Sequence, residues 1–225
     1  MIKTENYLQK IGDDIWFTEV DRSDLKIDYR IKEVVYSESS PIQEIMILDS
    51  YDFGRMLVLD DAVQTTAQDG YIYNEMIAHI PLNIHPNPKN VLIIGGGDCG
   101  AAREAAKHHN IDRIDMVEID EMVVKASKQY LQEVSGNLSD PRVNFIFEDG
   151  TAYVKEKRDY LYDVIIVDSS DPVGPAVKLF ELDFYKSLYE LLSEDGIMVC
   201  QSESPIFYAD IMRQTYQRIG SLFPI

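Results

Sequence analysis

The first quarter of the chain has a pattern of apolar and polar residues that predicts short β-strands. Apolar stretches of three to six residues are separated by turn-forming segments such as Ser39–Pro41 and Asp52–Gly54. Short strands with frequent turn residues are typical of hairpins and antiparallel sheets. We therefore predict a small N-terminal antiparallel β-sheet domain over residues 1–66.

A helix is predicted directly after this sheet, with Asp69 as its N-cap. Four apolar residues fall at helical spacing and are expected to share one buried face: Ile72, Met76, Ile77 and Ile80. The segment His85–Pro88 contains two prolines and is expected to end this region.

Beyond residue 88 the chain alternates continuous apolar runs with polar turns and helical segments. The predicted strands cover residues 91–94, 114–117, 143–147, 164–167 and 197–200. Continuous apolar runs are typical of parallel strands that are buried on both faces. Alternation of such strands with helices predicts an α/β fold with an open, doubly wound sheet, over residues 67–225.

Composition limits the kinds of partner. The 225 residues include 21 Lys and Arg against 39 Asp and Glu, a net charge of -18, which opposes nucleic-acid binding. No apolar run approaches the roughly 20 residues that would span a bilayer, and no secretory signal is visible at the N-terminus. The two cysteines, Cys99 and Cys200, are far apart and fit free thiols. We expect a cytoplasmic protein that binds neither nucleic acid nor membrane.

An acidic residue follows every predicted strand of the second domain. The set is Asp98, Glu118, Asp120, Asp149, Asp168, Asp171 and Glu203. Ligands of doubly wound sheets bind beyond the carboxyl ends of the strands, so these acids predict a negative pocket for a cationic ligand. Helix capping or hydration of the surface is the alternative for individual members, especially Asp120 and Asp171.

A glycine loop after the first strand of this domain predicts a nucleoside site. Gly95, Gly97 and Gly100 fit the G-x-G-x-x-G pattern, and Glu118 lies at the spacing of a residue that binds ribose hydroxyls. Nicotinamide cofactors and sulfonium nucleosides both fit this geometry. Asp98 would repel the pyrophosphate of a dinucleotide, which favours a decarboxylated sulfonium nucleoside.

The sequence resembles the spermidine synthase family of polyamine aminopropyltransferases. The segments that carry the resemblance are Trp16–Glu19, Gln43–Ile45, Gly54–Asp60, His85–Pro88, the Gly95 loop, Val117–Asp120, and Asp168–Pro172 with Gly174–Ala176. The resemblance implies an N-terminal β-sheet domain, a Rossmann-like methyltransferase-type domain and a homodimer or homotetramer. Family members continue for several tens of residues beyond a segment like Ser221–Pro224, so we expect the last two sheet strands to be missing here.

The resemblance also implies the reaction: an aminopropyl group moves from decarboxylated S-adenosylmethionine, a co-substrate, to putrescine, with no cofactor and no metal. Asp168 would accept the proton of the attacking amine and Tyr73 would orient that amine. The implied donor-binding residues are Gln43, Gly95, Gly97, Asp98, Glu118, Asp149 and Gly150. The implied acceptor-binding residues are Trp16, Asp171 and Gln201.

Some positions depart from the family pattern. Cys99 stands where a glycine is common, and Gly70, Tyr71 and Asn74 also differ from the usual residues. Cys99 would carry a conformational cost if its φ angle is positive. The alternatives to spermidine synthesis are therefore transfer to another amine, or a non-catalytic homologue that binds a nucleoside or a partner subunit.

Overall fold

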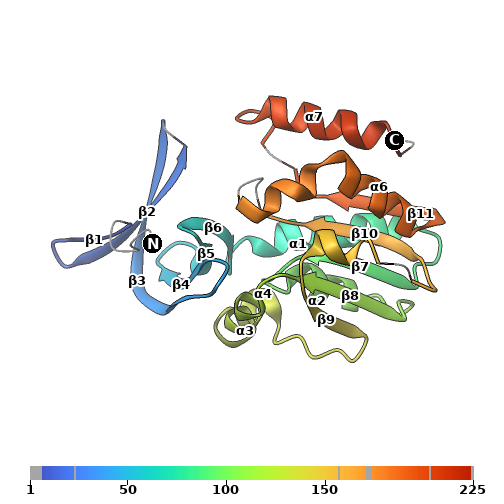
Figure 1. Cartoon of the computed structure of the whole chain (residues 1–225). Coiled ribbons are helices and arrows are strands. Elements are labelled where there is room, and N and C mark those ends of the chain that lie inside the picture. The colour runs from blue at the N-terminus through green and yellow to red at the C-terminus, as the bar shows by residue number, and fades with distance from the viewer. Residues whose placement is uncertain (1–6, 23, 157, 171–173, 203, 224–225) are drawn as a thin grey trace. The chain divides into compact units, whose positions relative to one another are not determined.

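The computed structural model describes residues 7–22, 24–156, 158–170, 174–202 and 204–223, which fall into two compact units (Figure 1). The first, the β unit, contains the described residues up to Tyr73 together with Gly97–Gly100 and Asp120–Leu138. The second, the α/β unit, contains Asn74–Gly96, Ala101–Ile119 and the described residues from Ser139 onward.

The β unit contains a six-stranded antiparallel sheet, which confirms the predicted sheet. Its strands follow one another in chain order: β1 (Leu8–Ile11), β2 (Asp14–Arg22), β3 (Leu25–Ser39), β4 (Glu44–Ser50), β5 (Gly54–Leu59) and β6 (Ala62–Thr66). Side chains alternate between the two faces of a strand. Met46 and Leu48 of β4 pack with Phe17 and Ile31, whereas Ile45 and Ile47 belong to a separate cluster. Both faces of the central strand are therefore buried.

The second of these clusters is completed by two helices from the later part of the chain. These helices are α3 (Glu121–Tyr130) and α4 (Gln132–Ser135). Their residues Val123, Ala126, Leu131 and Val134 are buried against the strand residues of this face. Two helices from within the segment 67–225 thus pack with the N-terminal sheet.

The α/β unit is built on a five-stranded sheet in which all neighbouring strands are parallel. The order is β11 (Leu192–Cys200), β10 (Tyr162–Asp168), β7 (Asn90–Gly95), β8 (Arg113–Glu118) and β9 (Val143–Phe147). The strand order reverses direction at β7 and β10, which confirms the doubly wound α/β fold. β11 begins five residues before the predicted strand 197–200, and its pairing with β10 is irregular over this added part.

The remaining helices are α1 (Gly70–Ile84), α2 (Gly100–Ala106), α5 (Gly150–Tyr153), α6 (Leu182–Leu191) and α7 (Ala209–Gly220), with the 3₁₀ segment η2 (Gly174–Phe180). The predicted buried face of α1 was largely wrong. Ile77 is buried, but Ile72, Met76 and Ile80 are 54%, 56% and 46% exposed. Asn74, Ala78 and Leu82 follow one another at i, i+4 spacing beside Ile77, and this second stripe is the buried one.

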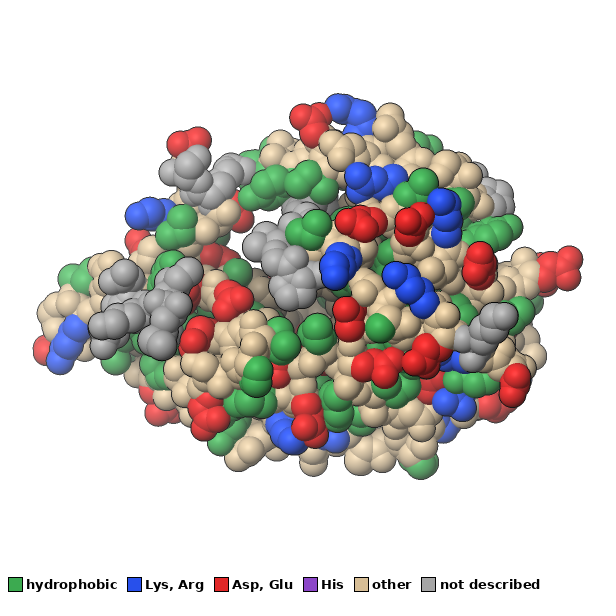
Figure 2. Space-filling view, viewed as in Figure 1, with side chains coloured by type: hydrophobic (Ala, Val, Ile, Leu, Met, Phe, Trp, Pro, Cys, Tyr) green, Lys and Arg blue, Asp and Glu red, His purple; other side chains and the backbone are tan. Residues whose placement is uncertain are grey.

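Charged groups are spread over the surface. Figure 2 shows Asp and Glu side chains across the visible face with Lys and Arg among them. Part of the net charge of -18 therefore comes from solvated carboxylates on the surface. Among the described residues, no helix is long and apolar enough to span a membrane.

Candidate functional site

The carboxyl ends of the parallel strands bring six of the predicted site residues to one edge of the sheet in the α/β unit. Gly95 at the end of β7 pairs with Asp168 at the end of β10, and Glu118 ends the neighbouring strand β8. Asp149 and Gly150 follow β9, and Gln201 follows β11. The backbone N–H of Gln201 donates to the carbonyl oxygen of Val167 at 2.9 Å, which fixes this residue beside β10.

The glycine loop and Asp168 are in close contact. Gly95 and Gly96 have φ angles of 84° and 75°, which glycine adopts at little cost. The N–H of Gly96 donates to the carbonyl oxygen of Asp168 at 2.9 Å. A Cβ atom on Gly96 would lie 3.2 Å from Asp168 Oδ2, so the carboxylate of Asp168 lies directly beside the loop. A ligand that approaches the loop backbone would meet this carboxylate.

The turn after β9 is packed just as closely. A Cβ atom on Gly150 would lie 2.7 Å from Ile94 Cγ2 on β7. Asp149 is exposed and caps α5, because its Oδ1 accepts the N–H of Thr151 at 2.8 Å. Glu118 is only 9% exposed. The edge therefore combines a buried carboxylate, an exposed carboxylate and two glycine turns.

The other predicted residues that the structure describes belong to the β unit. Trp16 is partly buried on β2, Gln43 precedes β4, and Tyr73 is 41% exposed in the first turn of α1. Asp98, in the loop with Gly97, accepts the N–H of Gly100 at 2.7 Å through Oδ1. Asp98 thus caps the start of α2 in addition to any role with a ligand. Asp171, also predicted, lies outside the described residues.

Asp120 has a structural role that holds Gln43 in place. Its Oδ1 accepts the N–H of Met122 at 3.0 Å, which makes it the N-cap of α3. Its Oδ2 accepts Gln43 Nε2 at 3.0 Å and Ser40 Oγ at 2.6 Å. The capping alternative is confirmed for Asp120. The contact with Gln43 was not predicted, and the single signal in the sequence was an aspartate in front of a helix.

Two departures from the family pattern have structural consequences. Cys99 is buried with a φ of 67°, so a Cβ atom occupies a conformation that glycine adopts more easily. Asn74 is 2% exposed and its Oδ1 has no hydrogen-bond partner among the described residues. Among all the residues that the structure describes, no group of three or more His, Cys, Asp or Glu side chains could hold a metal ion.

Comparison with protein families matches both parts of the chain. Residues 15–67 match the spermidine synthase tetramerisation domain, and residues 70–225 match the spermine/spermidine synthase domain. The polyamine aminopropyltransferase of Desulforudis audaxviator is 46% identical over 211 residues, which cover 94% of this chain and 76% of that protein. The enzyme of the same name from Methanocaldococcus jannaschii is 50% identical over 199 residues, covering 88% and 68%.

Solved structures of spermidine synthases have the same fold as this chain. A spermidine synthase crystallised with the transition-state analogue AdoDATO superposes with a TM-score of 0.91 at 37% identity, covering 97% of this chain and 74% of that one. The spermidine synthase of Thermotoga maritima gives a TM-score of 0.87 at 36% identity, with 97% and 73% covered. The chain therefore spans about three quarters of the length of most of these proteins.

Proposed function

Because the chain belongs to the spermidine and spermine synthase family of polyamine aminopropyltransferases, we propose that it transfers an aminopropyl group from decarboxylated S-adenosylmethionine to putrescine. The products are spermidine and methylthioadenosine. The observation that carries the proposal is the carboxylate of Asp168 beside the Gly95–Gly96 loop, at the point where the strand order reverses. A carboxylate there suits a donor that is cationic and carries no pyrophosphate.

The donor would be held by residues that match its chemistry. Glu118 would accept hydrogen bonds from the ribose hydroxyls, and Asp149 with Gly150 would bind the adenine. Gly95 and Gly97 allow the loop backbone to approach the nucleoside closely. Gln43 and Asp98 would hold the aminopropyl chain, with Asp98 facing its ammonium group.

The transfer needs one new bond, one broken bond and one proton acceptor. The neutral amine of putrescine attacks the aminopropyl carbon attached to sulfur, and the carbon–sulfur bond breaks with its electron pair going to sulfur. The sulfonium is thereby neutralised to the thioether of methylthioadenosine. Asp168 would take the proton that the new ammonium loses, while Tyr73 orients the attacking nitrogen and Trp16, Asp171 and Gln201 line the diamine site.

A single assay tests the proposal. Purified protein is incubated with decarboxylated S-adenosylmethionine and with putrescine, cadaverine or spermidine in separate reactions, and methylthioadenosine is followed by chromatography. We expect the fastest release with putrescine. Asp168→Asn should lower kcat by about 100-fold or more, since a general base contributes about that much, and should leave methylthioadenosine binding intact. Asp195→Asn, at an exposed carboxylate of the same unit, is the matched control and should keep the parent rate.

Two other outcomes support the alternatives. Release only with cadaverine or spermidine would assign another acceptor, a reading favoured by the buried Asn74, whose Oδ1 has no partner among the described residues. Binding of methylthioadenosine without release from any amine would identify a non-catalytic homologue. An Asp168→Asn variant as active as the parent would remove Asp168 from its proposed role.

Assembly and location complete the proposal. The match of residues 15–67 to a tetramerisation domain supports a homo-oligomer, a dimer or a tetramer. Light scattering during size-exclusion chromatography distinguishes them by mass, and a monomer would contradict both. The cytoplasmic location stays a prediction.

A further inference from the structure

A buried carboxylate outside the predicted site organises the α/β unit. Asp115 of β8 is fully buried, the one charged residue among the apolar neighbours Ile114, Met116 and Val117. Its oxygens accept hydrogen bonds from Arg113 Nε (2.8 and 2.9 Å), Tyr162 OH (2.8 Å), Asn144 Nδ2 (2.9 Å) and Tyr160 OH (3.0 Å). Burial alone would raise the pKa of Asp115, but the bonds from Arg113, Tyr162 and Asn144 hold it below its usual value. The carboxylate is therefore a stable, charged centre of the cluster.

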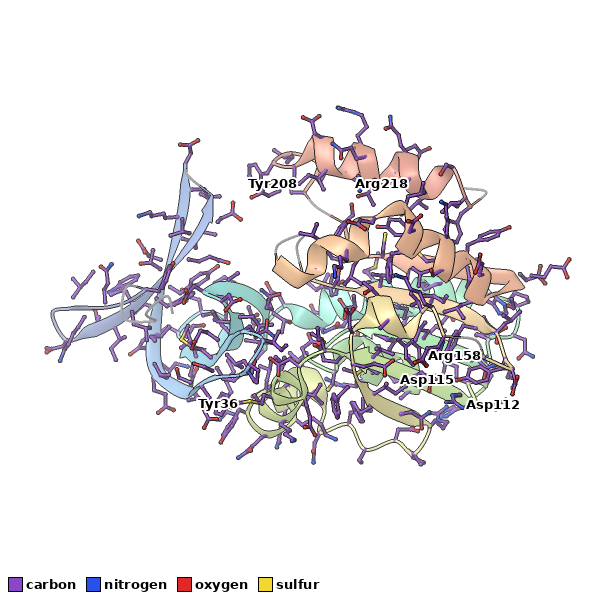
Figure 3. All side chains as sticks on the ribbon, in the orientation of Figure 1. Tyr36, Asp112, Asp115, Arg158, Tyr208 and Arg218 are labelled. Atoms are coloured by element: carbon purple, nitrogen blue, oxygen red, sulfur yellow. The ribbon has the colours of Figure 1, made fainter. Side chains whose placement is uncertain are left out.

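The cluster reaches α5 through Tyr153. The hydroxyl of Tyr153 lies 2.7 Å from the hydroxyl of Tyr162 and 3.4 Å from Asp115 Oδ2. The Arg158 guanidinium lies over the Tyr153 ring, with Cζ 3.6 Å from the ring centroid, and Nη1 donates to the Tyr153 carbonyl oxygen at 2.8 Å. Figure 3 labels Asp115 and Arg158 in this region. Both the side chain and the backbone of Tyr153 are thus held.

The helix that ends at Tyr153 is too short to hold its own shape. α5 has four residues, about 6 Å of helix, and segments of that length are not stable without tertiary contacts. Its first residue, Gly150, packs against Ile94, and its last, Tyr153, is tied to Asp115 and Tyr162. The position of the Asp149–Gly150 turn therefore depends on the tyrosine contact at the other end of α5.

The same carboxylate lies on the strand that carries the proposed ribose-binding residue. Asp115 precedes Glu118 by three residues on β8, and Asn144 joins it to β9, which leads into Asp149. The cluster thus connects the elements that bear both proposed contacts to the nucleoside.

We infer that Asp115 and Tyr153 are positioning residues for the nucleoside half of the donor, acting through the Asp149–Gly150 turn. The inference rests on the proposed function, because it assigns the adenine to that turn. Neither residue takes part in the transfer itself. Loss of the Tyr153 hydroxyl should therefore raise the KM for decarboxylated S-adenosylmethionine and leave the KM for the amine and kcat at saturating donor unchanged.

The experiment compares two tyrosine hydroxyls that each have a hydrogen-bond partner. Tyr153→Phe removes the hydroxyl at the end of α5. Tyr29→Phe removes a hydroxyl that donates to Glu19 Oε2 at 3.1 Å in the β unit. Calorimetry with methylthioadenosine, together with the three kinetic parameters and a thermal melt, is recorded for both variants and the parent. We expect Tyr153→Phe to bind methylthioadenosine about five-fold or more weakly, the effect of one lost hydrogen bond, and Tyr29→Phe to match the parent.

The outcomes separate this inference from the proposed function. If the parent binds methylthioadenosine and Tyr153→Phe binds it equally well, the positioning role is wrong and the proposed function stands. If the parent does not bind methylthioadenosine, both the positioning role and the proposed function are wrong. If Tyr29→Phe weakens methylthioadenosine binding as much as Tyr153→Phe does, the loss of affinity comes from general destabilisation, and the inference is wrong. Should Tyr153→Phe fail to fold, Tyr162→Phe removes the same 2.7 Å contact together with the Tyr162 bond to Asp115. It leaves the Tyr153 hydroxyl 3.4 Å from Asp115 Oδ2, and the same comparison applies.

Discussion

The backbone of Gly95 lies so close to Asp168 that a Cβ atom at Gly95 would stand only 2.2 Å from the Asp168 carbonyl oxygen. The two residues pair at the ends of β7 and β10. The proposed proton acceptor is thereby fixed against the loop that would receive the donor. The glycine loop and the backbone of Asp168 are therefore in direct contact.

Replacement of Gly95 should disrupt this contact. Gly95→Ala combines a φ of 84° with a clash against backbone atoms. Gly12→Ala is the matched control, because Gly12 has a φ of 65° but nothing within 4 Å of the added Cβ. We expect the control to lose about 1 kcal/mol of unfolding free energy, from the left-handed conformation alone, and Gly95→Ala to lose at least twice as much. Urea unfolding measures both, and calorimetry should show no methylthioadenosine binding by Gly95→Ala; equal losses would contradict the close approach.

Asp120→Asn should weaken the β unit. Asparagine keeps an oxygen that can cap α3, but it replaces Oδ2, the acceptor of the bonds from Ser40 and Gln43, with an NH₂ donor. We expect a loss of about 1–2 kcal/mol in urea unfolding, the usual effect of losing hydrogen bonds to a charged acceptor. Glu121→Gln, at a neighbouring exposed residue paired with Lys125, should cost no more than a few tenths of a kcal/mol by the same measurement. A control as destabilised as Asp120→Asn would show that the lost charge alone, and not the lost bonds to Ser40 and Gln43, is responsible.

The histidine pair formed by His79 of α1 and His108, just after α2, should make stability depend on pH. His108 Nε2 lies 2.9 Å from His79 Nδ1, and His79 Nε2 lies 3.0 Å from Glu104, which also pairs with Lys107. Burial, and then the nearby His79, lower the pKa of His108 below 6.5, with Glu104 opposing. The unfolded chain then binds a proton at a higher pH than the folded chain does, so the unfolding free energy should fall as pH drops below about 6.5.

His108→Gln tests that dependence. The variant should show a flatter decline of unfolding free energy between pH 6.5 and the lower pKa of the folded protein, measured by urea titrations at several pH values. His109→Gln, at the exposed neighbouring histidine, should keep the decline of the parent. A decline of equal slope in His108→Gln and the parent would assign it to other groups.

The two thiols should be unreactive in the folded protein. Cys99 is buried, and burial raises the pKa of Cys200 to about 11. The thiolate is the reactive form, so at pH 8 only about one Cys200 in a thousand would be ionised. Titration with a disulfide reagent at pH 8 should label neither cysteine quickly, and both at once after unfolding in guanidinium. Fast labelling of one thiol in the native protein would contradict the burial.

Local patterns determined much of this protein. The continuous apolar runs predicted the five parallel strands, because a strand buried on both faces needs apolar residues at every position. The positions of Gly95 and Glu118 also followed from the sequence, since a turn and a strand end are defined by neighbouring residues. The family resemblance, carried by contiguous motifs, was confirmed by the matched domains and solved relatives.

Tertiary structure decided what depends on residues distant in the chain. α1 has two helical stripes that could be buried, and only packing selected the stripe with Asn74 and Ala78 over the one with Ile72 and Met76. The contacts of Asp120 with Gln43 and of Asp115 with Tyr162 join residues 77 and 47 positions apart. Such pairs leave no periodic signal, because each forms only after separate segments have packed together. The sequence therefore placed the residues at the strand ends, and the folded chain determined which side chains hold them there.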